Sequence, residues 1–228
     1  MARLAAIALL SDAGIDFAPF EARAHWRKFE PDEVLVDFHD LSSDVYFLVS
    51  GEVRVLVRTP AGKEVILGET RGGQLFGELA AIDGVKRSAN VTALTRGETC
   101  VMSAKVFRDL VFSSQVVTER LLRLLTARVR ELNERFIEHA VLDVRHRLYA
   151  ELLRLSVPRG GHPGERVVTP PPFHHVLANR ICCRREQITR EFTTMAREEL
   201  IERSRGAIVV RRPDILKARI DEAMREDV

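Results

Sequence analysis

The stretch Phe76–Ala89 reads F-G-E-L-A-A-I-D-G-V-K-R-S-A. Gly77 has no Cβ, so the backbone at this point can approach a ligand closely. The residues after it can form one helical turn, whose free N–H groups would point at an anion. Arg87 offers a planar fork of donors for phosphate oxygens, and Ser88 adds a hydroxyl and a backbone N–H. Glu78 would repel a phosphate but suits a ribose hydroxyl, so the stretch predicts a site for a sugar joined to a phosphate.

The same stretch resembles the phosphate-binding cassette of cyclic-nucleotide-binding domains. In that family a G-E-L turn and an R-[SAT]-A segment hold the ribose and the cyclic phosphate. Here both halves fall in register, together with the A-x-I and D-G between them. The alternative is a surface turn in a β-rich domain with an isolated arginine, which the correct spacing of both halves disfavours. The resemblance implies five ligand-binding residues: Gly77, Glu78, Leu79, Arg87 and Ser88.

Length, composition and charge limit the possible architectures of the chain. The 228 residues suffice for two modest domains, each with a core of its own. A hydrophobic fraction of 46% and a charged fraction of 30% are typical of a soluble globular protein. The net charge is +2, but residues 140–228 hold 17 Lys and Arg against 13 Asp and Glu. This basic C-terminal part favours contact with a polyanion.

Neither a membrane segment nor a disulfide framework is expected. The longest early apolar run, Leu4–Leu10, is too short to span a bilayer and lacks the layout of a signal peptide. The three cysteines stand at positions 100, 182 and 183, a spacing that does not make a disulfide framework. The economical interpretation is a reducing cytoplasm.

Short β-rich runs separated by glycine turns extend from Ala22 to Val101. The predicted strands include Glu33–Phe38, Val45–Val49, Glu52–Val57, Glu64–Leu67, Ser88–Ala93 and Thr99–Ser103. They predict an antiparallel, jelly-roll-like β-roll that holds the cassette between two of its strands. A cupin enzyme would need closely spaced His and carboxylate metal ligands, whereas this part has only His25 and His39, fourteen residues apart. We therefore expect no enzyme and no metal.

Helical periodicity becomes pronounced after Ser114. Apolar residues recur at three- and four-residue spacing, in the series Leu121, Leu125, Val129, Leu132, Phe136 and Ala140. One interpretation is that this stripe merely covers its own β-roll. The length of the helix favours instead a two-helix dimer seam.

A second motif lies between Phe173 and Arg205, after a loop rich in glycine and proline. It predicts a short helix, a turn at Cys182-Cys183 and a second helix from about Arg184. The second helix would bury Ile188, Phe192 and Met195 at i, i+4 and i+7. A hairpin, made by Leu200-Ile201 and Ile208–Val210, would follow it as the wing of a winged helix-turn-helix.

Three charged side chains, Arg185, Glu186 and Arg190, would project from the exposed face of this second helix. Arginine pairs with O6 and N7 of guanine, and glutamate accepts from N4 of cytosine, so these side chains suit base edges. The alternative is that Arg185 and Arg190 are ordinary solvated helix arginines.

Across nearly the whole chain, this combination resembles the CRP/FNR family of bacterial transcription regulators. The resemblance implies an α+β fold with a cyclic-nucleotide-binding β-roll (1–113), a dimerisation helix (114–140) and a winged helix-turn-helix (141–228), with a hinge at Leu142-Asp143-Val144. It also implies a cytoplasmic homodimer that takes cAMP or cGMP as its allosteric effector, binds palindromic TGTGA-like double-stranded DNA and works with RNA polymerase.

The resemblance also assigns residues to these roles. It places Arg185, Glu186 and Arg190 on bases, with Arg184, Gln187 and Thr189 as further DNA-contacting residues. Leu132 and Asn133 fall where the family touches the nucleotide base, Asn133 reaching across the dimer.

The chain departs from the family pattern at three positions. Leu132 cannot donate a hydrogen bond, which leaves the choice between adenine and guanine open. Cys182 replaces the usual glycine of the turn, and Arg184 replaces the usual Ser or Thr helix cap. Two function classes remain: a cyclic-nucleotide-activated, DNA-binding homodimer, and a DNA-binding regulator that responds to another effector or to none.

Overall fold

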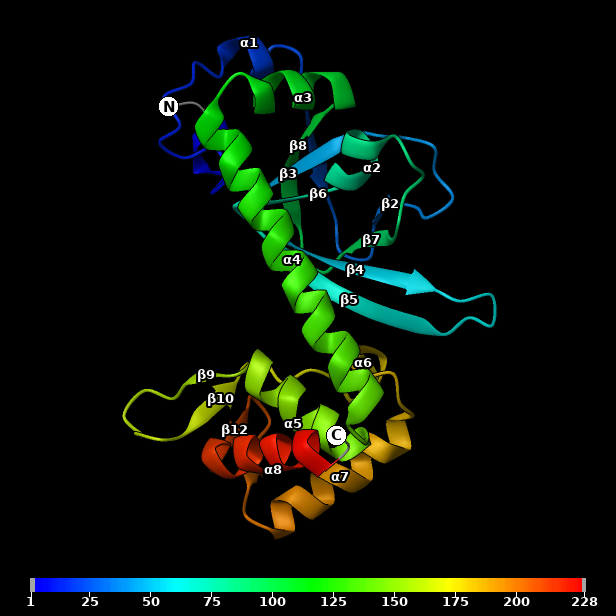
Figure 1. Ribbon diagram of the computed structural model, residues 1–228, viewed down its shortest axis with the longest axis vertical. Helices are drawn as coiled ribbons and strands as arrows, with labels where there is room; N and C mark the ends of the chain where they lie inside the picture. Colours follow the sequence, from blue (N-terminus) through cyan, green and yellow to red (C-terminus); the bar gives the residue numbers. More distant parts are fainter. Residues whose placement is uncertain (1–2, 227–228) are drawn as a thin grey trace. The chain divides into compact units, whose positions relative to one another are not determined.

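The computed structural model describes residues 3–226, and their contacts divide them into two compact units that meet at Arg128 and Val129. Each unit has its own hydrophobic core. The predicted fold class is confirmed, because antiparallel sheets form the N-terminal part, a long helix follows, and a helix-turn-helix lies in the C-terminal part (Figure 1).

The first unit consists of two four-stranded antiparallel sheets and the helices that pack on one of them. Its elements are the 3-10 helix η1 (Arg3–Ala6), α1 (Ala18–Glu21), β1 (His25–Phe29), β2 (Val34–Val36), β3 (Val45–Ser50), β4 (Glu52–Arg58), β5 (Glu64–Arg71), β6 (Gln74–Phe76), α2 (Glu78–Asp83), β7 (Asn90–Ala93), β8 (Gly97–Met102), α3 (Ala104–Phe112) and the first part of α4 (Gln115–Val141). One sheet has the strand order β1-β8-β3-β6, and the other has the order β2-β7-β4-β5.

Strand β3 shows why the first sheet is buried on both faces. Successive side chains of a strand point to opposite sides. Tyr46 and Leu48 therefore join the cluster that both sheets share, while Val45 and Phe47 join the cluster formed with the helices. An uninterrupted apolar run is the sequence pattern that such a two-sided strand requires.

The predicted strand set is incomplete. Strands β1 and β6 were not predicted, since β1 carries the charged run H-W-R-K-F and β6 is only three residues long. In β4, simple alternation of side chains would place Val53, Val55 and Val57 on one face. A register shift between Val55 and Leu56 breaks that alternation, and Leu56 is buried together with Val53.

Helix α4 begins against the core of the first unit and ends in the second. Leu121 is buried in the helix-side cluster, and Leu125 packs on it. Further along the stripe Val129, Leu132 and Phe136 are 55%, 54% and 73% exposed in the single chain. The stripe thus covers its own β-roll at one end only, and its other end exposes apolar side chains.

The second unit packs four helices around a small four-stranded sheet. After the end of α4 come α5 (Val144–Leu155), β9 (Val157–Pro158), β10 (Arg166–Val168), α6 (His174–Arg180), α7 (Arg185–Arg197), β11 (Ile201–Arg203), β12 (Ile208–Val210) and α8 (Pro213–Glu226). The sheet order is β11-β12-β10-β9, and β11 pairs with β12 as the predicted hairpin.

Asp143 caps the first helix of this unit. Its side chain accepts a hydrogen bond of 2.9 Å from the backbone N–H of His146, so the short segment between α4 and α5 ends at a defined N-cap. Within residues 3–226, no helix is both long enough and apolar enough to cross a membrane.

Candidate functional site

The predicted cassette lies where α2 joins β6 to β7 (Figure 1). Gly77 has φ of 81°, in the left-handed region. A Cβ on Gly77 would lie 2.9 Å from the carbonyl oxygen of Asp44 and 3.0 Å from Nη1 of Arg87. Both the positive φ and the lack of space therefore require glycine here.

Arg87 is 4% exposed and is held against the backbone of this turn. Its Nη1 donates to the carbonyl oxygen of Gly77 at 3.0 Å, and its Nη2 donates to the carbonyl oxygen of Asp44 at 2.9 Å. The guanidinium also lies 5.9 Å from the centre of the Tyr46 ring, whose hydroxyl has a pKa raised by burial. These contacts fix the position of a buried cation.

A loop residue occupies the remaining edge of this guanidinium. The hydroxyl of Ser42 accepts from Nη2 of Arg87 at 2.8 Å and from Nε at 3.2 Å, and it donates to Asp40 at 2.9 Å. Hydrogen bonds from the backbone and the side chain of Ser42 keep the pKa of Asp40 below its ordinary value. Most donors of Arg87 are thus used within the chain, and a phosphate would have to share them or replace Ser42.

Glu78 is 3% exposed and is paired with a cation from α4. Nη1 of Arg128 contacts its Oε1, and Nη2 of Arg128 donates to the carbonyl oxygen of Leu75 at 3.0 Å. A carboxylate buried this deeply would be costly without such a partner.

The other predicted cassette residues differ in placement. Leu79 and Ser88 are both exposed. Leu132 and Asn133 belong to the second unit, where both are exposed on α4. The structure therefore brings Gly77, Glu78 and Arg87 together within the first unit.

Sequence reasoning missed the residues that complete this arrangement, Ser42 and Arg128. Ser42 lies 45 residues from Arg87, and Arg128 lies 50 residues from Glu78. No pattern in the sequence near these residues predicts either contact. The available signal was indirect: a buried carboxylate needs a nearby cation, and the long helix offers several arginines.

The predicted recognition helix is α7. Ile188, Phe192 and Met195 are at most 1% exposed and belong to the core of the second unit. The predicted DNA-contacting residues Arg184, Arg185, Glu186, Thr189 and Arg190 are exposed, whereas Gln187 is half-buried. One side of α7 therefore holds the helix in place, and the other presents two predicted base-reading arginines.

Both departures from the usual helix-turn-helix pattern are accommodated locally. Cys182 adopts φ of 54°, the backbone conformation for which glycine is usually chosen. Oε1 of Gln187 accepts from the backbone N–H of Arg184 at 3.0 Å, as the N3 residue of a capping box does, and the N–H of Gln187 donates to the backbone carbonyl oxygen of Arg184 at 3.0 Å. Among residues 3–226, no three His, Cys, Asp or Glu side chains gather as a metal site.

An unpredicted buried ion-pair network supports α6. Glu151 on α5 is 1% exposed, and its two oxygens contact Nη1 of Arg180 on α6 at 3.2 Å and Nη1 of Arg154 at 2.6 Å. Arg154 also reaches Glu138 near the end of α4 at 2.5 Å. These ion pairs thus link the end of α4, α5 and α6, the first helix of the helix-turn-helix.

Comparison with known proteins identifies both parts of the chain. The family model of the cyclic nucleotide-binding domain matches residues 26–114, and that of the Crp-like helix-turn-helix domain matches residues 146–219. The chain belongs to the CRP/FNR family. The cAMP-activated global transcriptional regulator CRP of Salmonella typhimurium is 32% identical over 138 residues, which cover 60% of this chain and 66% of that relative. The match thus spans just under two thirds of that CRP/FNR relative.

Solved CRP/FNR-like structures share the fold. A mutant of CooA from Carboxydothermus hydrogenoformans has a TM-score of 0.78 at 14% identity, over 91% of this chain and 92% of its own. The regulator CLP of Xanthomonas campestris, described as responsive to c-di-GMP, has a TM-score of 0.68 at 20% identity, over 83% and 95%. At these identities the likeness concerns the fold alone.

Proposed function

We propose that this chain is a cyclic-nucleotide-dependent transcription regulator that binds palindromic, TGTGA-like DNA as a homodimer. The observation that carries the proposal is the buried guanidinium of Arg87 beside Gly77 and Glu78, in a chain that also carries an exposed recognition helix. Such a regulator is not an enzyme, and it acts in the cytoplasm, where its DNA is.

The effector is cAMP or cGMP. Its cyclic phosphate takes donors from Arg87 and Ser88, and its ribose donates to Glu78, with Leu79 beside them. The base lies against Leu132 and Asn133, with Asn133 contributed across the dimer. An asparagine amide offers both a donor and an acceptor, so it meets an adenine or a guanine edge.

The exposed end of the α4 stripe supports the dimer. Val129, Leu132 and Phe136 recur on one helical face, and a second copy of the same face would cover them. The resulting dyad would place two α7 helices about 34 Å apart in successive major grooves, so the operator is a palindrome. Nucleotide binding acts on the hinge near Asp143 so that both helices reach their grooves together, and the bound dimer then acts on RNA polymerase.

A second candidate is a regulator of the same fold that responds to another effector or is constitutively active. The specific observation in its favour is that Ser42 already occupies two donor groups of Arg87, and Arg128 already occupies Glu78. A related fold described as c-di-GMP-responsive is consistent with this alternative.

Calorimetric titration with cAMP and with cGMP, each with and without a palindromic duplex, tests the proposal. We expect one nucleotide to bind and to tighten specific DNA binding. Binding to a panel of single-base operator variants then tests direct readout of bases. Replacing Arg185 or Arg190 should weaken the free energy of DNA binding by about 1–3 kcal/mol and relax the preference at one base pair. A uniform loss across the panel for Arg185→Ala would refute direct readout. Tight specific binding without nucleotide would favour the second candidate.

A further inference from the structure

The guanidinium of Arg87, to which the proposed function assigns the cyclic phosphate, already has partners within the chain. Its Nη1 donates to the carbonyl oxygen of Gly77, and its Nη2 donates to that of Asp44. Both Nε and Nη2 donate to the hydroxyl of Ser42. These bonds engage four of the five N–H groups of a guanidinium. A paired grip on a phosphate needs two N–H groups and therefore requires one of the three acceptors to leave.

Ser42 is the acceptor that can leave. Gly77 is the N-cap of α2, and Asp44 directly precedes β3, so both carbonyl oxygens belong to the framework of the β-roll. Ser42 instead lies on the loop that joins β2 to β3, residues 37–44 (the 37–44 loop). Its hydroxyl accepts from Nε at 3.2 Å and from Nη2 at 2.8 Å, the two donors on one side edge of the guanidinium. Paired phosphate oxygens bind along such an edge.

The 37–44 loop is ordered mainly by its own hydrogen bonds. The backbone N–H groups of His39 and Ser42 donate to the side chains of the aspartates two residues earlier, each at 2.9 Å. Residues 37–41 are all exposed, so little apolar burial holds the loop in place. Among residues 3–226, the hydrogen bonds that join positions 39–43 to the chain outside the loop all run through Ser42. Release of this side chain therefore frees the tip of the loop.

Asp40 directs the Ser42 hydroxyl toward the guanidinium. Its Oδ2 accepts from this hydroxyl at 2.9 Å, so the lone pairs of the Ser42 oxygen remain for Arg87. Hydrogen bonds from Ser42 and attraction to Arg87 keep the pKa of Asp40 below its ordinary value, so the carboxylate is charged at neutral pH. Ser42 and Asp40 together thus offer an acceptor backed by a negative charge, as an anionic ligand would. The same charge repels an incoming phosphate.

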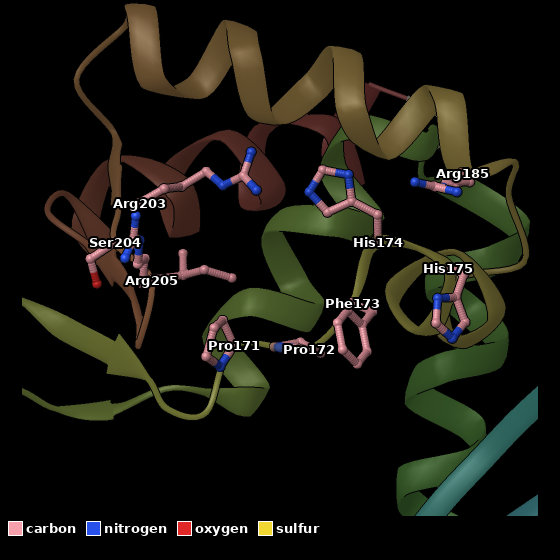
Figure 2. A pocket seen from close by; sticks show the side chains of 10 residues that line it. Pro171, Pro172, Phe173, His174, His175, Arg185, Arg203, Ser204 and Arg205 are labelled. Carbon is pink, nitrogen blue, oxygen red and sulfur yellow. The ribbon is translucent and has the colours of Figure 1, made fainter.

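The second unit contains arginines that lack such a competitor. Figure 2 shows Arg185, Arg203 and Arg205 around a cavity of about 440 Å³, and none of the three has an ion pair with a carboxylate among residues 3–226. These guanidinium groups can meet an anion without losing a hydrogen-bonded acceptor. At Arg87 the acceptor has to be displaced first, so a ligand of this residue binds against a cost that the chain itself sets.

We propose that the hydroxyl of Ser42 competes with the cyclic phosphate for Arg87, and that the 37–44 loop carries Ser42 and Asp40 away when the effector binds. The inference rests on the proposed function for the identity of the ligand. Only molecules with an open loop can bind, so the apparent affinity is reduced by the fraction of molecules in which the loop is open. Ser42 thus sets the affinity of the site without contacting the bound effector.

The first test is calorimetric titration of the full chain with cAMP and with cGMP. We expect Ser42→Ala to tighten the binding of whichever nucleotide the wild type binds by about five- to thirtyfold, because hydrogen bonds to a charged group disappear from the free state alone. Ser42→Thr keeps the hydroxyl and should bind as the wild type does. Ser43→Ala is the matched control, because Ser43 is the half-buried neighbour whose hydroxyl makes no hydrogen bond among residues 3–226.

Asp40→Asn is a second variant, which tests the charge separately from the hydroxyl. It keeps an oxygen that accepts from Ser42 but removes the carboxylate beside Arg87. We expect nucleotide affinity to rise by about two- to fivefold at low salt, and by less at high salt, because screening weakens the repulsion that the wild type exerts.

Stopped-flow kinetics with a fluorescent cyclic-nucleotide analogue distinguish competition from a general structural role. The closed loop obstructs Arg87 only in the free protein. Ser42→Ala should therefore raise the association rate constant by the same factor as the affinity and leave the dissociation rate constant unchanged. A serine that contacts the bound nucleotide would instead give a faster dissociation when replaced.

Inorganic phosphate, titrated against chloride of equal ionic strength, probes Arg87 without ribose or base. We expect Ser42→Ala to bind it more tightly than the wild type does, and Ser42→Ala/Arg87→Ala to lose this binding. If neither nucleotide binds any variant while this phosphate result holds, the proposed function fails and the competition by Ser42 stands.

The proposal is overturned if Ser42→Ala binds the nucleotides and phosphate only as well as Ser43→Ala does, because Ser42 then does not compete for Arg87. Weaker binding by Ser42→Ala overturns it as well, since the hydroxyl would then be a contact of the bound ligand. It is also overturned if no variant binds either nucleotide or phosphate, because removal of the hydroxyl would then open no anion site.

Discussion

Replacing Arg87 by alanine perturbs the proposed nucleotide site and the fold together, and the structure separates the two effects. The guanidinium donates to the carbonyl oxygens of Gly77 and Asp44 and to the hydroxyl of Ser42. Its loss leaves these acceptors to find other partners, so Arg87→Ala should lower the free energy of unfolding by about 1–3 kcal/mol. It also removes the counter-charge of the cyclic phosphate, which should cost about 2–4 kcal/mol in affinity.

Isothermal titration with cAMP and cGMP measures the second quantity, and urea unfolding measures the first. Trp26, the single tryptophan, lies in β1 of the first unit and reports unfolding there. Arg54→Ala is the matched control, because Arg54 is a half-buried arginine of the same unit that pairs with Glu69 at 2.9 Å and makes no contact with the cassette. We expect it to lower stability without changing nucleotide affinity. Arg87→Lys keeps the charge without the fork and should fall between wild type and alanine.

The reasoning is refuted if Arg87→Ala, at concentrations where it is folded, binds both nucleotides as wild type does. It is equally refuted if Arg54→Ala loses as much affinity as Arg87→Ala, because the loss would then follow from general destabilisation.

Four further predictions concern Glu78, Arg128, Asn133 and Glu151. Glu78→Ala should weaken binding of a ribose nucleotide more than that of its 2′-deoxy analogue. Arg128→Ala should leave the carboxylate of Glu78 buried without its cation, which should lower the free energy of unfolding of the first unit, measured in urea, by about 1–3 kcal/mol. Asn133→Ala should reduce cAMP affinity more than cGMP affinity in titration, and an equal loss of both would mean that this residue does not choose between them. Glu151→Leu should lower the free energy of unfolding by about 3–5 kcal/mol, because it leaves the buried guanidinium of Arg180 without a counter-charge. The double variant Glu151→Leu/Arg180→Met should recover most of that stability. A double variant that loses as much stability as the two single variants together would contradict the pairing.

The sequence predicted those features that depend on local pattern. The need for a glycine at position 77, the buried face of α7 and the pairing of β11 with β12 all follow from spacing and residue type within a few positions. It also predicted that Cys182 would take the place of a turn glycine. Each of these rests on short-range geometry that a chain segment specifies by itself.

What the sequence could not predict depends on contacts between distant segments. Strand β1 reads H-W-R-K-F, which lacks alternation, and it becomes a strand because β8 pairs with it from His25 to Phe29. Arg128 looks like any solvated helix arginine until the carboxylate of Glu78 is found buried beside it. Arg180 was counted among neither the core nor the site residues, yet it is 7% exposed because Glu151 neutralises it.

The ion pairs of the second unit bear on how a change in α4 reaches the helix-turn-helix. Glu138, in the last turn of α4, is joined through Arg154 and Glu151 to Arg180 on α6. The backbone between α4 and α5 runs through Leu142-Asp143-Val144, where the family resemblance implies a hinge. Because the ion pairs cross this joint, turning α6 relative to the end of α4 requires Arg154 to release Glu138 or Glu151 to release Arg180. The first contact is partly exposed and the second is buried, so the pair at Glu138 opens at the lower free-energy cost. Any rotation between these helices should therefore break the pair between Arg154 and Glu138 first, while the buried pair of Glu151 and Arg180 still joins α5 to α6.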